Sequence, residues 1–268
     1  MRVFTRKNHQ FFQLVGSVSI GFILSACVHH DGRDHDDHGH HHSHASHKGH
    51  IVAKPSQGVA PEFDIVHAKI TTEGSHLVFQ QAVRGEAGRK HPKKIGQLAG
   101  AEVFSYVWPT NLNSSSVGFE KDAGILALAL TVHPDFDDTP LYDEDGDGDR
   151  KNDGDHWHSH WVVLVPDHAC GQGSLKVKDI AKGSEPQLPK TWPGLPLFID
   201  SPGYEFSIKH SELLVRVPLK DVGFPNQFRF DGVTAGLKVH QHVHAPLLCV
   251  ANVFDIGSGD LSLPGKSL

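Results

Sequence analysis

Short apolar runs separated by turn-forming residues dominate the chain from about residue 61 onward. The runs are rich in Val, Ile, Phe and Leu, and clusters of Gly, Pro, Asp and Asn divide them. Runs of this kind are typical of β-strands. We expect strands at Phe63–Ile70, His76–Val83, Glu102–Val107, Gly124–Val132, Trp157–Val165, Glu212–Val217 and His244–Val250. The 27 Gly and 16 Pro leave few windows for a long amphipathic helix. The pattern therefore predicts a mainly β fold, with residues 61–268 forming a single β-sandwich or barrel-like domain.

The first 26 residues follow a different pattern, with a basic start and then an apolar stretch too short to span a bilayer permanently. The stretch ends in Leu24-Ser25-Ala26-Cys27, which resembles the lipobox of bacterial lipoproteins. The resemblance implies that residues 1–26 are a lipoprotein signal peptide and that Cys27 becomes lipidated after cleavage. Several acyl chains would then anchor the protein to a membrane. The alternative is an ordinary signal peptide with a chance cysteine.

Val28, the residue after Cys27, indicates a membrane location, and the net charge indicates which partners to exclude. Val28 stands where lipoproteins retained in the inner membrane of enteric bacteria carry Asp, so we expect the outer membrane, facing the periplasm. Removal of residues 1–26, which hold three Lys/Arg and no Asp/Glu, changes the formal charge from −6 to −9. A protein this acidic lacks the basic surface that nucleic-acid binding requires. Nucleic acid is therefore excluded as a partner.

Two cysteines remain beyond the lipobox, Cys170 and Cys249. In an oxidising periplasm they are expected to form one disulfide. Neither belongs to a CxxC pair, so a zinc site made of thiolates is the lesser alternative.

Residues 27–60 form a low-complexity segment that carries ten histidines. These are His29, His30, His35, His38, His40, His41, His42, His44, His47 and His50. With few apolar side chains to offset the entropy of ordering, the segment is expected to be a disordered tether. Imidazole binds zinc, nickel and copper(II), so the tail is a candidate metal collector. Its composition resembles the His/Asp-rich segments of bacterial zinc-uptake binding proteins and metallochaperones.

Two HxHxH triplets lie at the starts of predicted strands within the domain. The six histidines are His156, His158, His160, His240, His242 and His244. Side chains alternate along a strand, so the three histidines of a triplet share one face. The outer two are about 14 Å apart at the backbone, too far to bind one ion together. A complete site needs an HxH pair plus histidines from elsewhere, and the second triplet is the expected donor. His133, at the end of the strand before the first triplet, is a further candidate ligand, and exposed histidines without any metal are the alternative.

The acidic segment before the first triplet resembles the opening of a calcium-binding loop. Alternating carboxylates precede a glycine, but no Glu stands at the closing position. The candidate calcium ligands are Asp143, Asp145, Asp147, Asp149 and Asp153. A solvated acidic hairpin loop is the favoured alternative.

Together these features favour a lipid-anchored periplasmic protein that binds a transition metal, zinc foremost, with copper(II) or nickel as alternatives. It would act in metal scavenging, buffering or delivery, with a metal transporter or receptor as a candidate partner. No catalytic motif points to particular residues, so a binding protein is favoured over an enzyme. A metal-dependent enzyme with a His-ligated zinc–water centre and a β-sandwich recognition module remain alternatives. Metal binding by tail and domain is expected to weaken below about pH 6.5, where imidazole is protonated.

Overall fold

Antiparallel strands make up nearly all of the regular structure in the computed structural model, which describes residues 49–93, 95, 99–134, 148, 156–240 and 248–268. Of the described residues, 44% lie in strands and 6% in helices, so the fold is mainly β and confirms the predicted fold class. The strands are β1 (Ile51–Val52), β2 (Ile65–Glu73), β3 (His76–Val83), β4 (Glu102–Pro109), β5 (Ile125–Val132), β6 (His158–Pro166), β7 (Leu175–Val177), β8 (Ile199–Asp200), β9 (Phe206–Lys209), β10 (Glu212–Pro218), β11 (Arg229–Phe230), β12 (Val233–Val239), β13 (Leu248–Ile256) and β14 (Gly265–Lys266). Three short 3-10 helices are η1 (Ser114–Val117), η2 (His168–Cys170) and η3 (Leu219–Val222).

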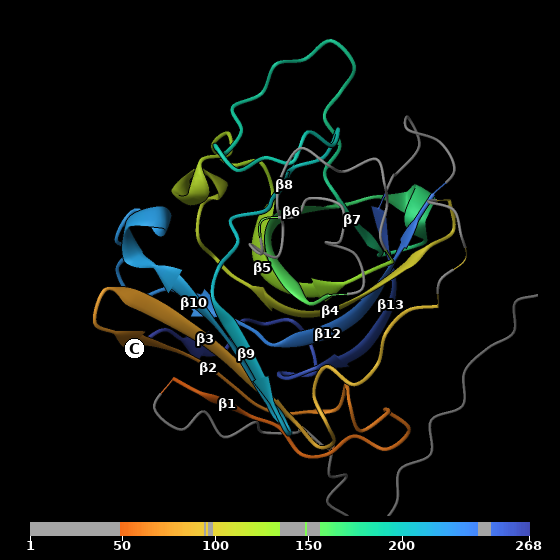
Figure 1. Cartoon of the computed structure of the whole chain (residues 1–268), viewed down its shortest axis with the longest axis vertical. Coiled ribbons are helices and arrows are strands. Elements are labelled where there is room, and N and C mark those ends of the chain that lie inside the picture. Colours follow the sequence, from red (N-terminus) through yellow and green to blue (C-terminus); the bar gives the residue numbers. More distant parts are fainter. Residues whose placement is uncertain (1–48, 94, 96–98, 135–147, 149–155, 241–247) are drawn as a thin grey trace, which may run out of the picture. The chain divides into compact units, whose positions relative to one another are not determined.

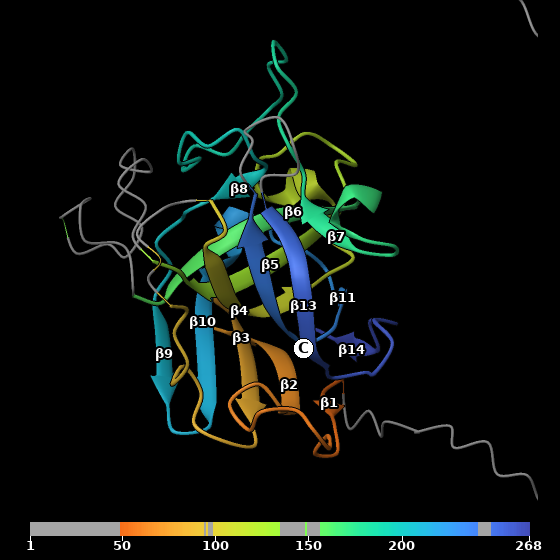
Figure 2. The same cartoon turned by 90° about the vertical axis from the view of Figure 1, so that its right-hand side faces the viewer.

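One sheet has five strands in the order β1-β2-β3-β10-β9, which lie side by side in Figure 2. Along β10 the buried residues Leu213, Val215 and Val217 alternate with more exposed ones. This period of two is typical of a sheet with one face on a core and the other in solvent.

The second sheet closes on itself into a barrel of six strands, in the order β5-β4-β12-β13-β7-β6 (Figure 1). The closing pair is β5–β6, which runs in register from Ile125↔Leu164 to Thr131↔His158. The short strand β8 pairs with β6 beside the barrel. Seven of the eight residues of β5 are buried, because one of its faces lines the barrel and the other packs on the first sheet.

The barrel and the five-stranded sheet enclose two separate interiors. The first, between the sheet and the outer face of the barrel, is filled by large aromatic side chains, and the ring of Phe79 lies 5.9 Å from those of both Trp108 and Trp161. The second, inside the barrel, is lined by Val, Leu, Ile and Ala side chains. The same strand contributes to both, since Trp161 and Val163 of β6 face the first interior and Val162 and Leu164 face the second.

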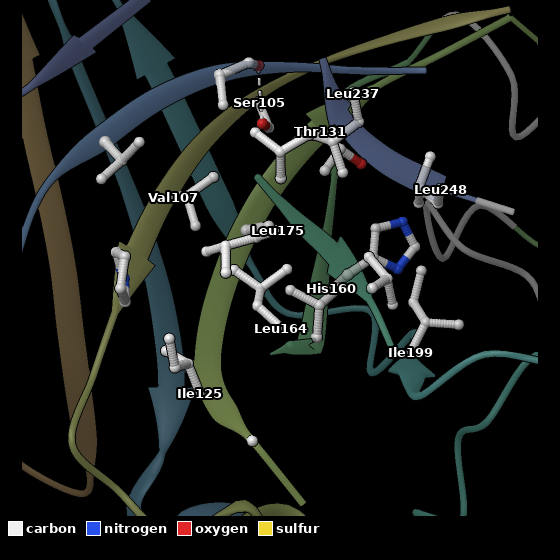
Figure 3. Close-up of a pocket in the computed structure, with 18 of the residues that line it drawn as sticks. Ser105, Val107, Ile125, Thr131, His160, Leu164, Leu175, Ile199, Leu237 and Leu248 are labelled. Carbon is white, nitrogen blue, oxygen red and sulfur yellow. Dashed lines mark hydrogen bonds between the residues drawn. The ribbon is translucent and has the colours of Figure 1, made fainter. Parts of the chain in front are cut away.

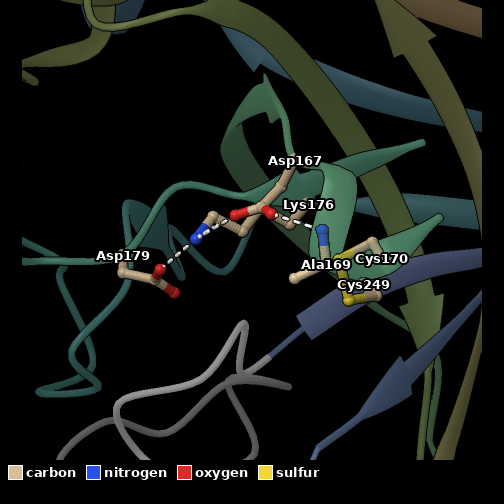
Figure 4. The surroundings of a disulfide bond; sticks show 6 residues. All are labelled: Asp167, Ala169, Cys170, Lys176, Asp179 and Cys249. Atoms are coloured by element: carbon tan, nitrogen blue, oxygen red, sulfur yellow. Dashed lines mark hydrogen bonds and ion pairs between the residues drawn. A yellow bond between two sulfur atoms is a disulfide. The ribbon is translucent and has the colours of Figure 1, made fainter. Parts of the chain in front are cut away.

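Among the described residues, the barrel seam with the fewest pairings lies between β7 and β13, which are joined by one residue pair, Lys176↔Cys249. A disulfide between Cys170 and Cys249, with Cα atoms 5.6 Å apart, crosses this seam (Figure 4). Lys176 adds ion pairs to Asp167, at 2.8 Å, and to Asp179. The covalent link thus supports the seam that has the fewest strand pairings among the described residues.

Each of the seven expected strands overlaps an observed strand, although β13 starts at Leu248 and extends to Ile256. The sequence pattern did not identify β12, which lies between β4 and β13 in the barrel and pairs with both. Among the described residues no helix is long and apolar enough to cross a membrane. The proposed signal peptide and Cys27 lie outside the described residues.

Candidate metal centre

Three buried histidines meet at one end of the barrel. His158 and His160 come from β6, and His133 follows β5 directly. Because β5 and β6 pair antiparallel with Thr131 opposite His158, the end of β5 brings His133 to the start of β6. One potential ligand atom from each of the three lies within 4.8 Å of the others. This His133/His158/His160 group is called the triad below.

The spacing of the triad suits one metal ion. The Nε2 atoms of His133 and His158 are 3.1 Å apart, and the rings of His158 and His160 have centroids 4.6 Å apart. Two nitrogens bound to one tetrahedral zinc at about 2.0–2.1 Å lie roughly 3.4 Å from each other. The side chains are therefore close to the separation that a shared ion requires.

The second nitrogen of each triad ring faces a backbone carbonyl. Nδ1 lies 2.9 Å from the Pro134 carbonyl in His133, 3.0 Å from the His156 carbonyl in His158 and 3.2 Å from the Asp200 carbonyl in His160. A carbonyl only accepts hydrogen bonds, so Nδ1 carries the proton and Nε2 presents its lone pair. This is how metal-binding histidines are usually held by their surroundings.

Burial keeps the imidazoles of His158 and His160 neutral. Desolvation, followed by the neighbouring histidines, lowers the pKa of His158 well below its usual value. Desolvation and His133 lower the pKa of His160 to about 3. A buried neutral imidazole can bind a metal without first losing a proton. The expectation that the folded site weakens below about pH 6.5 therefore does not follow for these two residues.

Asp200 lies next to the triad and its side chain is buried. Its backbone carbonyl accepts the hydrogen bond from His160. Desolvation raises the pKa of Asp200 to about 6, partly offset by a 2.6 Å hydrogen bond from the Thr191 hydroxyl. The Ser201 hydroxyl lies 3.0 Å from Nδ1 of His160. The sequence offered no signal for these partners, because they reach the triad through the short strand β8.

The remaining predicted domain ligands are not part of the triad. His156 and His240 are exposed, and His240 follows β12 rather than preceding a strand. His242 and His244 lie outside the described residues, so their contribution stays a prediction. The third histidine of the triad is thus His133, which follows β5, and not a residue of the second triplet.

The tail contributes one described histidine, His50, whose Nδ1 lies 3.3 Å from Nε2 of His67. Burial, as the largest cause, lowers the pKa of both. The other tail candidates, His29–His47, lie outside the described residues. So do the candidate calcium ligands Asp143, Asp145, Asp147, Asp149 and Asp153.

The triad adjoins a cavity of about 630 Å³ in the barrel lumen, which His133 and His160 help to line. Figure 3 shows His160 beside Ile199 and Leu248, with Thr131 and Ser105 further along the wall. The sequence did not predict this lumen, since aliphatic residues of barrel and core look alike along the chain.

The comparisons with known proteins add no assignment. The sequence matches no family model, and no curated protein or solved structure resembles it significantly.

Proposed function

We propose that this protein binds a transition-metal ion, zinc foremost, through Nε2 of His133, His158 and His160. The observation that carries the proposal is the approach of Nε2 of His133 to Nε2 of His158, at 3.1 Å, while both Nδ1 atoms face carbonyls. Two nitrogens that share one zinc ion would lie at about this separation. Imidazole-only sites suit zinc, copper(II) and nickel.

The metal would be scavenged, buffered or delivered at the bacterial cell envelope. The lipobox-like segment ending at Cys27 supports lipid anchoring, and the His-rich tail behind it supports collection of ions near the membrane. Exposed tail histidines exchange ions readily, whereas the buried triad would hold one ion in a defined geometry. A metal transporter or receptor is the proposed recipient.

A second candidate function, a metal-dependent enzyme, is favoured by one observation. The lumen cavity of about 630 Å³ touches two of the three triad histidines, so a small molecule in it would lie beside the metal. Catalytic zinc sites keep a position for water or substrate. A change in the visible spectrum of cobalt-substituted protein on adding azide would reveal such a position and favour the enzyme.

The test uses residues 28–268, without the proposed lipidation site Cys27, and with the nine histidines between residues 29 and 47 replaced by Gln, so that these nine cannot supply metal ligands. Zinc is titrated in competition with a chromophoric chelator. We expect one zinc per chain, and His158→Ala or His160→Ala should weaken binding at least about 100-fold, more than the loss of an outer partner.

The matched control is His76→Ala, which removes a histidine of β3 in the five-stranded sheet and should leave zinc affinity unchanged. Circular dichroism of each variant establishes that it is folded. Equally weak zinc binding by the unsubstituted protein and both triad variants would contradict the proposal.

A further inference from the structure

The lumen cavity is elongated along the barrel strands. Its lining includes Ile125 at the start of β5 and Thr131 near the end of the same strand. Six residue steps of an extended strand span about 20 Å. The volume of about 630 Å³ falls within the usual range of small-molecule sites, roughly 300–1,000 Å³. At about 30 Å³ per water molecule it offers space for roughly twenty water-sized groups.

The walls of the lumen favour an alkyl chain. They are built mainly from Val, Leu, Ile and Ala side chains, and no Phe, Tyr or Trp is among the described residues that line the cavity. Away from the two triad imidazoles, a planar ring would find no aromatic face for stacking there. Apolar cavities of this kind exclude water and take up apolar molecules. The small residues Ala129 and Ala235 keep the middle of the lumen hollow.

One polar group in the lumen stands out at the triad end. The Thr131 hydroxyl is buried and has no hydrogen-bond partner among the described residues. The nearby lumen residue Ser105 differs, because its hydroxyl donates to the Ala235 carbonyl at 2.9 Å. Leaving a buried hydroxyl without a partner is costly, so such a group suggests an absent polar ligand atom. Thr131 lies opposite His158 in the β5–β6 pair.

We propose that the lumen binds a single-chain carboxylic acid, with its alkyl chain along the barrel and its carboxylate beside Thr131 and the metal held by the triad. The head group's position rests on the proposed metal site, because a divalent cation there would attract an anion. The far end of the cavity is lined by Asp122, Asn111 and Asn113. The negative charge of Asp122 disfavours the opposite orientation.

The experiment uses the zinc-loaded protein of residues 28–268, which lacks the proposed lipidation site Cys27, after removal of non-covalently bound lipid. Tritiated hexadecanoic acid is the probe, measured by equilibrium dialysis, and hexadecan-1-ol is the probe without a carboxylate. We expect one acid per chain, bound at least about tenfold more tightly than the alcohol, since a hydrogen bond to a charged group is worth about that factor or more. Removal of zinc should lower the affinity for the acid by a similar factor.

Substitutions locate the bound acid. Ala235→Leu and Ala129→Leu fill the lumen. Each should lower the affinity for the acid at least about tenfold, because the added side chain occupies the space of the alkyl chain. Ala181→Leu makes the same change at an exposed position and should have no effect. Thr131→Val keeps the shape of the side chain and removes its hydroxyl. It should lower the affinity for the acid about tenfold, while the zinc affinity and the Tm stay unchanged.

Acid binding by folded Ala235→Leu and Ala129→Leu proteins at wild-type affinity would overturn the proposal, because the acid would then lie outside the lumen. Equal affinity for acid and alcohol, or equal acid affinity with and without zinc, would overturn the head-group position. Zinc binding without any acid binding would also overturn this inference and leave the proposed function intact. A protein that fails to bind zinc fails the metal test itself, and lumen binding of the acid would then disprove the carboxylate–metal contact.

Discussion

The two faces of β6 lie in two interiors that differ in composition and in packing. Trp161 and Val163 pack against the aromatic side chains between the sheet and the barrel, where Phe79 and Trp108 are fully buried. Val162 and Leu164, their neighbours in sequence, line the hollow lumen together with His160. A strand that is apolar on both faces thus serves a filled core with one face and a cavity with the other. The aromatic interior stabilises the fold, and the aliphatic interior is available for a ligand.

The largest effect that separates the two interiors is expected from truncating adjacent valines. Val163→Ala should lower the free energy of unfolding by about 2–3 kcal/mol, because it removes two buried methyl groups and leaves a cavity in a filled core. Val162→Ala should cost only about 1 kcal/mol, since its side chain already borders empty space. Urea unfolding of both metal-free variants measures the difference. Equal losses at the two positions would show that the lumen is as tightly packed as the core.

A smaller effect is expected from pH, at the point where the lumen borders the buried pair His160 and Asp200. The pKa of His160 is lowered to about 3, so only the unfolded chain takes up this proton between about pH 6.5 and 3, and stability falls as pH falls. The pKa of Asp200 is raised to about 6, so the folded chain takes up that proton first, and stability rises as pH falls from about 6 to 4. Between about pH 6 and 4, the effects of His160 and Asp200 on the free energy of unfolding therefore oppose each other.

Asp200→Asn should separate these two effects. Without the carboxyl group, the metal-free protein should gain about 1–3 kcal/mol near pH 7, because a buried charge is removed. Its stability should then fall by up to about 2.8 kcal/mol per pH unit between pH 6 and 4, because both His158 and His160 have lowered pKa values and each contributes up to about 1.4 kcal/mol per pH unit. Urea unfolding at several pH values checks this, with Asp122→Asn at the exposed end of the lumen as the matched control. Parallel pH profiles for the parent and Asp200→Asn would refute the opposing titrations.

The sequence predicted the strands of β2, β3, β5 and β10 because apolar periodicity marks them clearly. It missed β12, Val233–Val239, in which Thr234, Gly236 and Lys238 interrupt the apolar pattern. These three positions face out of the lumen, and only the register with β4 and β13 reveals their partners. The barrel could not be distinguished from a sandwich, since closure depends on pairing between distant strands.

The candidate metal centre was predicted in part. Alternation along a strand correctly placed His158 and His160 on one face, and the need for a further ligand followed from the length of the strand. His133 was recognised as a candidate, but the second triplet was preferred as donor. The hairpin-like succession of β5 and β6 was the available signal, because it brings the end of one strand to the start of the next. Thr131 and the hollow lumen depend on packing across the barrel, which local sequence does not specify.

X-ray absorption spectroscopy at the zinc edge tests the triad most directly. The sample is the zinc-loaded protein of residues 28–268 with its nine histidines between residues 29 and 47 replaced by Gln. We expect a shell of nitrogen scatterers at about 2.0–2.1 Å with the outer-shell pattern of three imidazoles, reduced to two in His160→Ala. A shell made only of oxygen atoms, or a spectrum unchanged by His160→Ala, would contradict metal binding by His133, His158 and His160.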